Sequence, residues 1–176
     1  MTGTAAMDLK TLIKDVPDWP QKGVVFKDIT PLLADPKAFD ETIERLAEPW
    51  KGKGVTIVAG IESRGFLLAA GVALKLRAGL VPVRKKGKLP RAVVGESYSL
   101  EYGTATIEAH VDAFPKGSKV LLVDDVLATG GTAKAAVSIL ERIGGSVVGT
   151  MFLIELGFLK GREKLPGRDC RSLIAY

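Results

Sequence analysis

The chain has 176 residues, of which 47% are hydrophobic and 26% charged, so it is long enough for one domain with a substantial core. A single cysteine, Cys170, excludes an intramolecular disulfide, and no secretory signal or membrane-length apolar run is present, so we expect a cytoplasmic protein. The formal net charge of +5 suits an anionic small substrate as well as nucleic acid, and one histidine with one cysteine makes a zinc site improbable.

The N-terminal part of the chain predicts two helices around an irregular segment. Residues 8–15 are compatible with a short helix. Residues 16–24 read VPDWPQKGV, in which prolines and a glycine predict irregular structure. Residues 36–46 predict a longer helix, because their apolar side chains recur on one helical face.

The next part of the chain predicts a strand, a helix and a second strand. Residues 55–59 form an apolar, β-branched run, which is typical of a buried strand. Ser63 is a suitable N-cap for a helix that continues to about Leu76. Residues 80–83 predict the second strand. The basic segment RKKGKLPRAVVGE, residues 84–96, lacks periodicity and predicts an exposed, mobile loop.

The C-terminal half again predicts strands and a helix. Residues 97–111 alternate between apolar and polar side chains. This pattern predicts a strand with one solvated face, which a hinge at Gly103 connects to a partner segment. Residues 119–123 and 147–154 predict fully apolar strands. A helix is predicted between these two strands, over residues 132–143.

This alternation predicts an α/β fold with a mostly parallel sheet and helices on both faces. The predicted helices have about 12 residues, and several strands are apolar on both faces. Ligands in such sheets bind beyond the carboxyl ends of the strands. The loops that would lie there are residues 60–65, 84–95 and 124–132.

The stretch VLLVDDVLATGGT, residues 120–132, predicts a binding site. Its glycines allow successive main-chain N–H groups to point inward at a helix N-terminus, where they can bind a phosphate. Asp124 and Asp125 would repel that phosphate unless they bind sugar hydroxyls or a magnesium ion of the same ligand. We therefore interpret the stretch as a holder for ribose 5-phosphate. The alternative is a buried acid pair followed by a flexible turn.

The same stretch resembles the thirteen-residue signature of the type I phosphoribosyltransferase family. Five further segments resemble, in the same order, those of family members that act on adenine: GVVFKDITPLL, GIESRGF, RKKGKLP, SYSLEYG and ELGFLKGREKL. The resemblance covers about residues 10–175. It implies a single type I phosphoribosyltransferase domain over residues 1–176, with a mobile lid loop and a small hood formed by about residues 1–35 and 155–176.

The resemblance also implies the reaction and the partners. The 5-phosphoribosyl group of phosphoribosyl pyrophosphate would pass to adenine, giving AMP and pyrophosphate in purine salvage. Magnesium would arrive on the substrate, without a dedicated protein ligand. A homodimer is implied, and neither nucleic acid nor a membrane is an expected partner.

The resemblance assigns roles to individual residues of this chain. Phe26 would stack on adenine, and Glu101 would act as general acid or base or bind the purine ring. The residues implied as catalytic are Glu101, Asp124, Asp125 and Arg64. Those implied for the 5-phosphate are Ala128, Thr129, Gly130, Gly131 and Thr132. Those implied for pyrophosphate are Glu62, Ser63, Arg64, Lys85, Lys88 and Tyr102, and those for adenine are Val25, Phe26, Lys27 and Leu159.

Two other functions remain open from the sequence. One is transfer of the same group to another purine, such as hypoxanthine or xanthine. The other is a regulator that binds the sugar phosphate, with or without nucleic acid, and has no catalytic activity.

Overall fold

The computed structural model describes residues 7–99 and 103–176, and its internal contacts divide the chain into residues 1–45 and 46–176. The first unit contains a 3-10 helix, a two-stranded antiparallel hairpin and two helices. Their bounds are Leu9–Leu12, β1 Lys14–Pro17, β2 Val25–Asp28, α1 Thr30–Ala34 and α2 Pro36–Ala47, the last of which crosses the boundary between the units.

The irregular structure predicted for residues 16–24 is confirmed for residues 18–24, which connect β1 and β2, whereas Val16 and Pro17 belong to β1. The prediction of a helix over residues 8–15 is wrong, because only one 3-10 turn forms before β1 begins. Between the strands, Asp18 adopts a left-handed backbone and its carboxylate accepts a hydrogen bond from Gly23 N at 2.7 Å. This side-chain contact closes a turn that the prolines alone do not reveal. The predicted helix over 36–46 is confirmed as α2.

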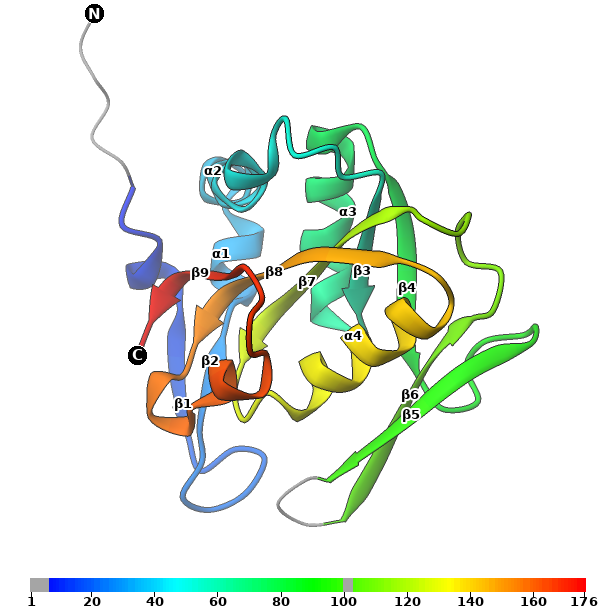
Figure 1. Cartoon of the computed structure of the whole chain (residues 1–176). Coiled ribbons are helices and arrows are strands. Elements are labelled where there is room, and N and C mark those ends of the chain that lie inside the picture. The colour runs from blue at the N-terminus through cyan, green and yellow to red at the C-terminus, as the bar shows by residue number, and fades with distance from the viewer. Residues whose placement is uncertain (1–6, 100–102) are drawn as a thin grey trace, which may run out of the picture. The chain divides into compact units, whose positions relative to one another are not determined.

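The second unit is built on a seven-stranded sheet (Figure 1). The strand order is β5-β6-β4-β3-β7-β8-β9. Their bounds are β3 Ile57–Ile61, β4 Gly79–Lys85, β5 Val93–Ser99, β6 Thr104–His110, β7 Lys119–Leu127, β8 Ser146–Glu155 and β9 Cys170–Ala175. Strands β4, β3, β7, β8 and β9 are parallel, whereas β5 and β6 are antiparallel additions at one edge. The predicted mostly parallel sheet is therefore confirmed.

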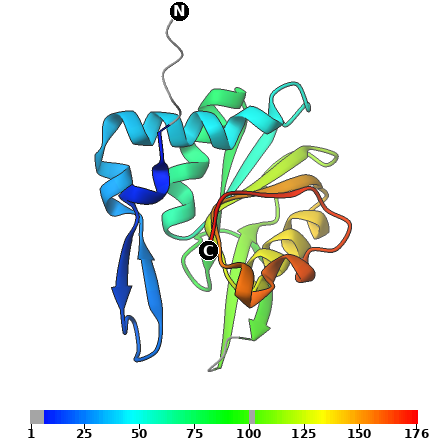
Figure 2. The same cartoon turned by 90° about the vertical axis from the view of Figure 1, so that its left-hand side faces the viewer.

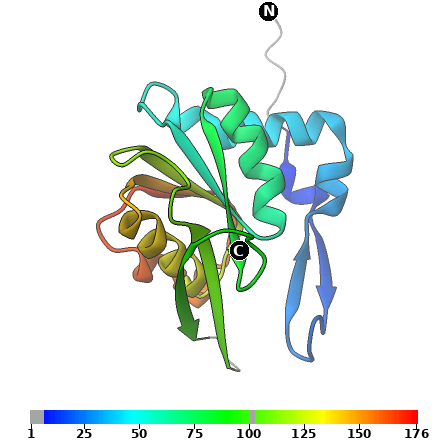
Figure 3. The ribbon, with the colours of Figure 1, turned by 90° about the vertical axis from the view of Figure 1, so that its right-hand side faces the viewer.

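Helices α3 (Arg64–Leu76) and α4 (Gly131–Arg142) cover opposite faces of this sheet (Figures 2 and 3). Successive residues of a strand point to opposite faces. Accordingly Ala59 and Ile61 belong to the buried cluster that contains the α4 side chains, whereas a Cβ at Gly60 would meet Ala69 of α3. No helix in the described part of the chain is long and apolar enough to cross a membrane.

The parallel registers bring several strand ends to one edge of the sheet. Ile61 at the end of β3 pairs with Val83 of β4, and Gly60 pairs with Val123 of β7. The turns that follow β3, β4 and β7 therefore leave the sheet on the same side, as the sequence predicts. These turns supply the residues of the candidate site.

Candidate active site

The turn between β7 and α4 forms a cradle of main-chain amides. Gly130 has a left-handed backbone, with φ of +78°, and α4 begins at the next residue. The first N–H groups of a helix have no acceptor within it, so they are available to an anion. A cavity of about 70 Å³ lies here, lined by Asp124, Val126, Leu127, Ala128, Thr129, Gly130, Thr132 and Ala133. The structure thus brings Asp124 and the predicted phosphate-loop residues other than Gly131 around one small space.

This turn packs directly against the backbone of a segment that lies about 30 residues further along the chain. A Cβ built on Gly130 would collide with the carbonyl oxygen of Gly161, and one built on Gly161 would collide with the carbonyl oxygen of Ala128. Both positions therefore require glycine, because two main chains touch with no room for a side chain. We did not select Gly161 from the sequence, where it is one of 20 glycines.

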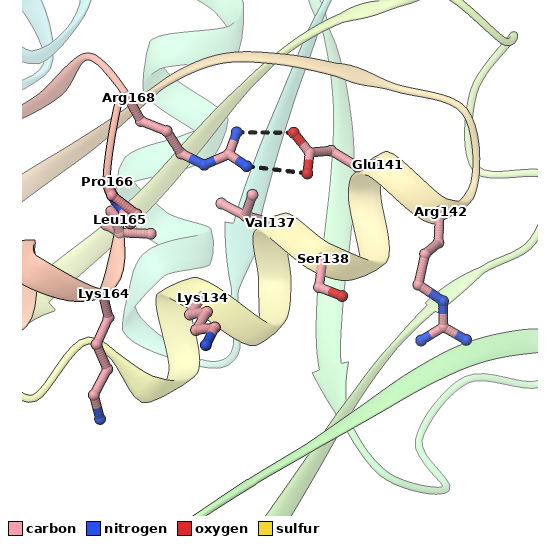
Figure 4. A pocket seen from close by; sticks show the side chains of 9 residues that line it. All are labelled: Lys134, Val137, Ser138, Glu141, Arg142, Lys164, Leu165, Pro166 and Arg168. Atoms are coloured by element: carbon pink, nitrogen blue, oxygen red, sulfur yellow. Dashed lines mark hydrogen bonds and ion pairs between the residues drawn. The ribbon is translucent and has the colours of Figure 1, made fainter.

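Two arginines hold this C-terminal segment in place. Arg162 donates from Nε to Glu155 Oε1 at 3.0 Å and from its other nitrogens to Glu155 Oε2 and the Cys170 carbonyl oxygen. The Arg162 guanidinium lowers the pKa of Glu155. Arg168 forms two hydrogen bonds with Glu141 of α4, at 2.8 and 3.1 Å, beside a groove of about 500 Å³ (Figure 4). The two pairs fasten the segment to β8 and to α4.

Asp124 and Asp125 lie within β7 and not at its end. The strand continues to Leu127 because its pairing with β8 persists past both acids. The predicted end at Val123 is therefore wrong: main-chain pairing continues after the apolar run stops. Asp125 is 6% exposed, and its Oδ2 lies 2.6 Å from Nε of Arg64 at the start of α3.

The two carboxyl groups resist ionisation. Burial, together with the adjacent carboxylate of Asp125, raises the pKa of Asp124 well above its usual range. Burial also raises the pKa of Asp125, although the Arg64 guanidinium opposes that shift. A Cβ at Gly65 would lie 2.5 Å from Asp124 Oδ1, so glycine there lets α3 approach the acid closely. A ligand with hydroxyl donors or a cation would relieve this enclosed charge.

The basic segment after β4 is shorter and more tightly held than the sequence predicts. Arg84 and Lys85 belong to β4, and β5 begins at Val93, so the loop comprises residues 86–92. Hydrogen bonds fix its start: Lys86 N donates to Thr106 O at 3.1 Å and Gly87 N donates to Glu108 Oε2 at 2.9 Å. The predicted bounds of 84–96 are therefore wrong, because β4 and β5 take up both ends of that range, whereas residues 85–88 and 90–92 are exposed as predicted.

The turn after β3 contains Glu62 and Ser63. Glu62 accepts hydrogen bonds from Arg84 and Lys88 of the basic segment, and the peptide bond between Glu62 and Ser63 is cis. Ser63 occupies the N-cap position of α3 as predicted, but its side chain makes no capping hydrogen bond. The residues predicted for pyrophosphate thus gather at one edge of the sheet, except Tyr102, which lies outside the described residues together with Glu101.

The residues predicted for adenine belong to both units. In the first unit, the Phe26 ring meets the Trp19 ring edge-on with centroids 4.3 Å apart, and Lys27 Nζ lies 2.6 Å from Asp15 Oδ1. Val25 beside them is 48% exposed. In the second unit, Leu159 is half-buried in the 3-10 turn Gly157–Leu159. Their roles toward a base remain predictions.

Comparison with known proteins shows what the chain resembles. A family model described as phosphoribosyl transferase domain matches residues 32–171. The chain is 60% identical over 170 residues to an adenine phosphoribosyltransferase of Thermobifida fusca, covering 94% of this chain and 97% of that protein.

Solved structures give the same result. A crystal structure of adenine phosphoribosyltransferase from Thermoanaerobacter pseudethanolicus is 49% identical, with a TM-score of 0.93, and the match covers 96% of this chain and 98% of that one. The Saccharomyces cerevisiae enzyme, solved with an imino-altritol bisphosphate and adenine, is 38% identical, with a TM-score of 0.89 and coverage of 95% and 97%.

We expect Gly161→Ala to weaken the binding of ribose 5-phosphate by about tenfold, equivalent to about 1.4 kcal/mol. The added methyl group would displace the Ala128 carbonyl and distort the amide cradle. Isothermal titration calorimetry measures the dissociation constant. Gly157→Ala is the matched control, because a Cβ there would meet Tyr176 O at 3.4 Å, an ordinary contact. Equal affinity in the Gly161 variant and the control would contradict the binding of the phosphate by the cradle.

We expect Asp124→Asn to raise the melting temperature at pH 7 by about 2–4 °C, the shift that about 1 kcal/mol produces in a protein of this size. The pKa of Asp124 is raised in the folded state, so the folded protein holds this proton more tightly than the unfolded chain does. The stability gained in this way is fully present below the usual pKa of aspartate and is lost as pH rises through the raised pKa. Calorimetry at pH 7 and near pH 4 should show the difference shrinking on acidification. A lower melting temperature of the variant at pH 7 would contradict the assignment.

Proposed function

Because the chain belongs to the phosphoribosyl transferase family, we propose that it transfers the 5-phosphoribosyl group of phosphoribosyl pyrophosphate to adenine, giving AMP and pyrophosphate. The observation that carries the proposal is the amide cradle beside two adjacent carboxyl groups on β7, of which Asp124 lines the same cavity and Asp125 is buried. Such a pair of sites fits a ligand with a phosphate at one end and a diol next to it. Adenine is bound in the yeast relative, which supports the choice of base.

The 5-phosphate would occupy the cradle formed by residues 128–132. Main-chain amides and the α4 dipole would bind its charge, and the hydroxyl groups of Thr129 and Thr132 would add donors. This end of the substrate takes no part in bond making. Its role is to fix the ribose so that the anomeric carbon stays in one position.

Asp124 and Asp125 would act on the ribose. As the bond from the anomeric carbon to pyrophosphate breaks, positive charge develops on the sugar. Carboxylates held next to that charge stabilise the transition state more than the ground state. The ion pair with Arg64 would restrict the rotation of the Asp125 side chain.

Magnesium would reach the site on the substrate. Among residues 7–99 and 103–176 no group of three or more acidic, histidine or cysteine side chains could hold a metal ion. The acid pair nevertheless supplies the oxygen atoms that magnesium prefers, and Asp125 Oδ2 has an ion-pair partner but no aligned hydrogen bond. When bound, the ion would supply positive charge that offsets the negative charge of the pyrophosphate group.

The leaving pyrophosphate would lie at the ends of β3 and β4. The groups that we assign to it are Ser63, Arg64, Lys85 and Lys88, together with Tyr102. Cations there stabilise the negative charge that the leaving group acquires. Glu62 is also predicted for this group, but its carboxylate carries negative charge and would repel the pyrophosphate.

The base would be held by residues of both ends of the chain. We propose one phosphoribosyltransferase domain over residues 1–176, with a hood from about 1–35 and 155–176. Val25, Phe26, Lys27 and Leu159 would contact adenine, since flat purines stack well on aromatic and aliphatic side chains. Glu101 would accept the proton that the attacking imidazole ring of adenine loses, or bind that ring.

We also propose a cytoplasmic homodimer. Leu67 and Leu74 lie seven residues apart on one face of α3, and Leu80 follows on β4, with exposures of 51, 81 and 48%. A cluster of exposed leucines on neighbouring elements is typical of a subunit interface. A second copy of this chain is the partner that we assign to it.

The direct test mixes the protein with magnesium, phosphoribosyl pyrophosphate and one of adenine, hypoxanthine or guanine, and chromatography then detects nucleotide. We expect AMP from adenine and little product from the other bases, because main-chain donors and acceptors distinguish an amino group from a carbonyl at the same ring position. Product from hypoxanthine alone would shift the specificity to another purine. No product from any base would favour a non-catalytic sugar-phosphate binder.

The dimer is tested by Leu74→Glu combined with Leu67→Glu. We expect the unmodified protein to have twice the chain mass by light scattering at micromolar concentration, and the variant to be a monomer, because charge on a buried apolar interface is costly. Val111→Glu, at a residue 46% exposed, is the control for adding a carboxylate to a surface apolar position. A variant that remains dimeric would place the interface elsewhere.

A further inference from the structure

Glu62 is the centre of a hydrogen-bonded cluster at the end of β3. Its carboxylate accepts from Lys88 Nζ at 2.7 Å, from Lys85 N at 3.1 Å and from Arg84 Nε at 3.2 Å. The Glu62 side chain is only 9% exposed. Burial alone would raise the pKa of Glu62, but the three donors lower it to about 2. The group is therefore an anion at every pH at which the protein is expected to work.

The same turn is tied down from the other side. Glu108 of β6, which is 8% exposed, accepts from Gly87 N at 2.9 Å, and Arg84 Nη1 donates to Lys88 O at 3.1 Å. Two buried carboxylates thus fix the main chain of residues 85–87. The side chain of Lys85, by contrast, has no acidic partner among the residues that the structure describes.

A direct contact between Glu62 and pyrophosphate is electrostatically unfavourable, because both carry negative charge. The arrangement suits a different task. Long basic side chains lose rotamer freedom when they bind an anion, and a site whose cations are already fixed loses less. Glu62 fixes the side chains of Arg84 and Lys88, and the main chain of Lys85, before substrate binds.

We propose that Glu62 is a positioning residue, which orients Arg84, Lys85 and Lys88 for the pyrophosphate group and does not itself contact that group. This inference rests on the proposed function for the identity of the ligand. For the affinity of pyrophosphate, this positioning role predicts the opposite of what the charge of Glu62 alone predicts. Removal of a nearby negative charge should tighten pyrophosphate binding by simple Coulomb attraction, whereas loss of positioning should weaken it.

The test measures pyrophosphate binding by calorimetry in the presence of magnesium, and the KM for each substrate where AMP is formed. We expect Glu62→Gln to weaken pyrophosphate binding and to raise the KM for phosphoribosyl pyrophosphate by about tenfold, equivalent to about 1.4 kcal/mol. The KM for adenine should stay within about twofold of the unmodified value, since random misfolding would alter both.

Glu62→Asp separates position from charge. It keeps the carboxylate but is one methylene shorter, so it cannot reach all three donors. We expect a loss of pyrophosphate affinity similar to that of Glu62→Gln, and unchanged affinity would show that charge alone matters and would overturn the inference. This variant also serves if Glu62→Gln does not fold.

Asp112→Asn is the matched control. Asp112 pairs with Arg91 of the same basic segment, but both side chains are more than half exposed, and such pairs contribute little. We expect its pyrophosphate affinity to be unchanged. Equal or tighter binding by Glu62→Gln would overturn the inference. If the unmodified protein binds pyrophosphate but forms no AMP, the binding comparison still decides the role of Glu62 while the proposed reaction fails.

Discussion

The placement of two adjacent carboxyl groups on an interior strand of the sheet is the constraint on which the rest of the site depends. Asp124 and Asp125 lie on β7, between β3 and β8, where neither can ionise freely. Arg64 partly compensates one of them, and Gly65 allows α3 to approach the other. Both acids therefore contact the first turn of α3. Two acids at this position lower the stability of the folded protein. Such destabilising groups are typical of functional sites.

The site also depends on how neighbouring turns are held. On one side of β7, Glu62 and Glu108 anchor the basic segment after β4. On the other side, Arg162 and Arg168 fasten the C-terminal segment to β8 and α4. Both arrangements use partly buried ion pairs with several hydrogen bonds, which are more specific in geometry than exposed pairs. The groups that would touch substrate are thus supported by others that would not.

Much of the sheet was predictable because its central strands are short apolar runs between helices with a clear apolar face. The elements that the sequence did not predict correctly have local causes. Strand β9, Cys170–Ala175, mixes polar and apolar residues, so its sequence resembles that of a loop. The predicted strand in β7 was too short because Asp124 ends the apolar run. The hairpin β1–β2 depends on the Asp18 carboxylate, which no periodicity reveals.

The site was predictable to a lesser extent. The amide cradle could be inferred from its glycines and its place before a helix, and the family resemblance supplied the remaining residues. The Glu62 cluster joins residues 22 and 26 positions apart, so spacing along the chain gives no indication of it. The anchoring of residues 86–87 was missed for the same reason, since Glu108 lies on a different strand.

The contact between Gly130 and Gly161 has an evolutionary consequence. Each glycine leaves room for the main chain of the other segment, so neither position can acquire a side chain unless the whole segment opposite moves. Surrounding positions can exchange one side chain for another and compensate through repacking, but a contact between two backbones has no such freedom. Sequence drift in this protein should therefore leave these two sites invariant together, even where Lys160 and Arg162 beside them diverge.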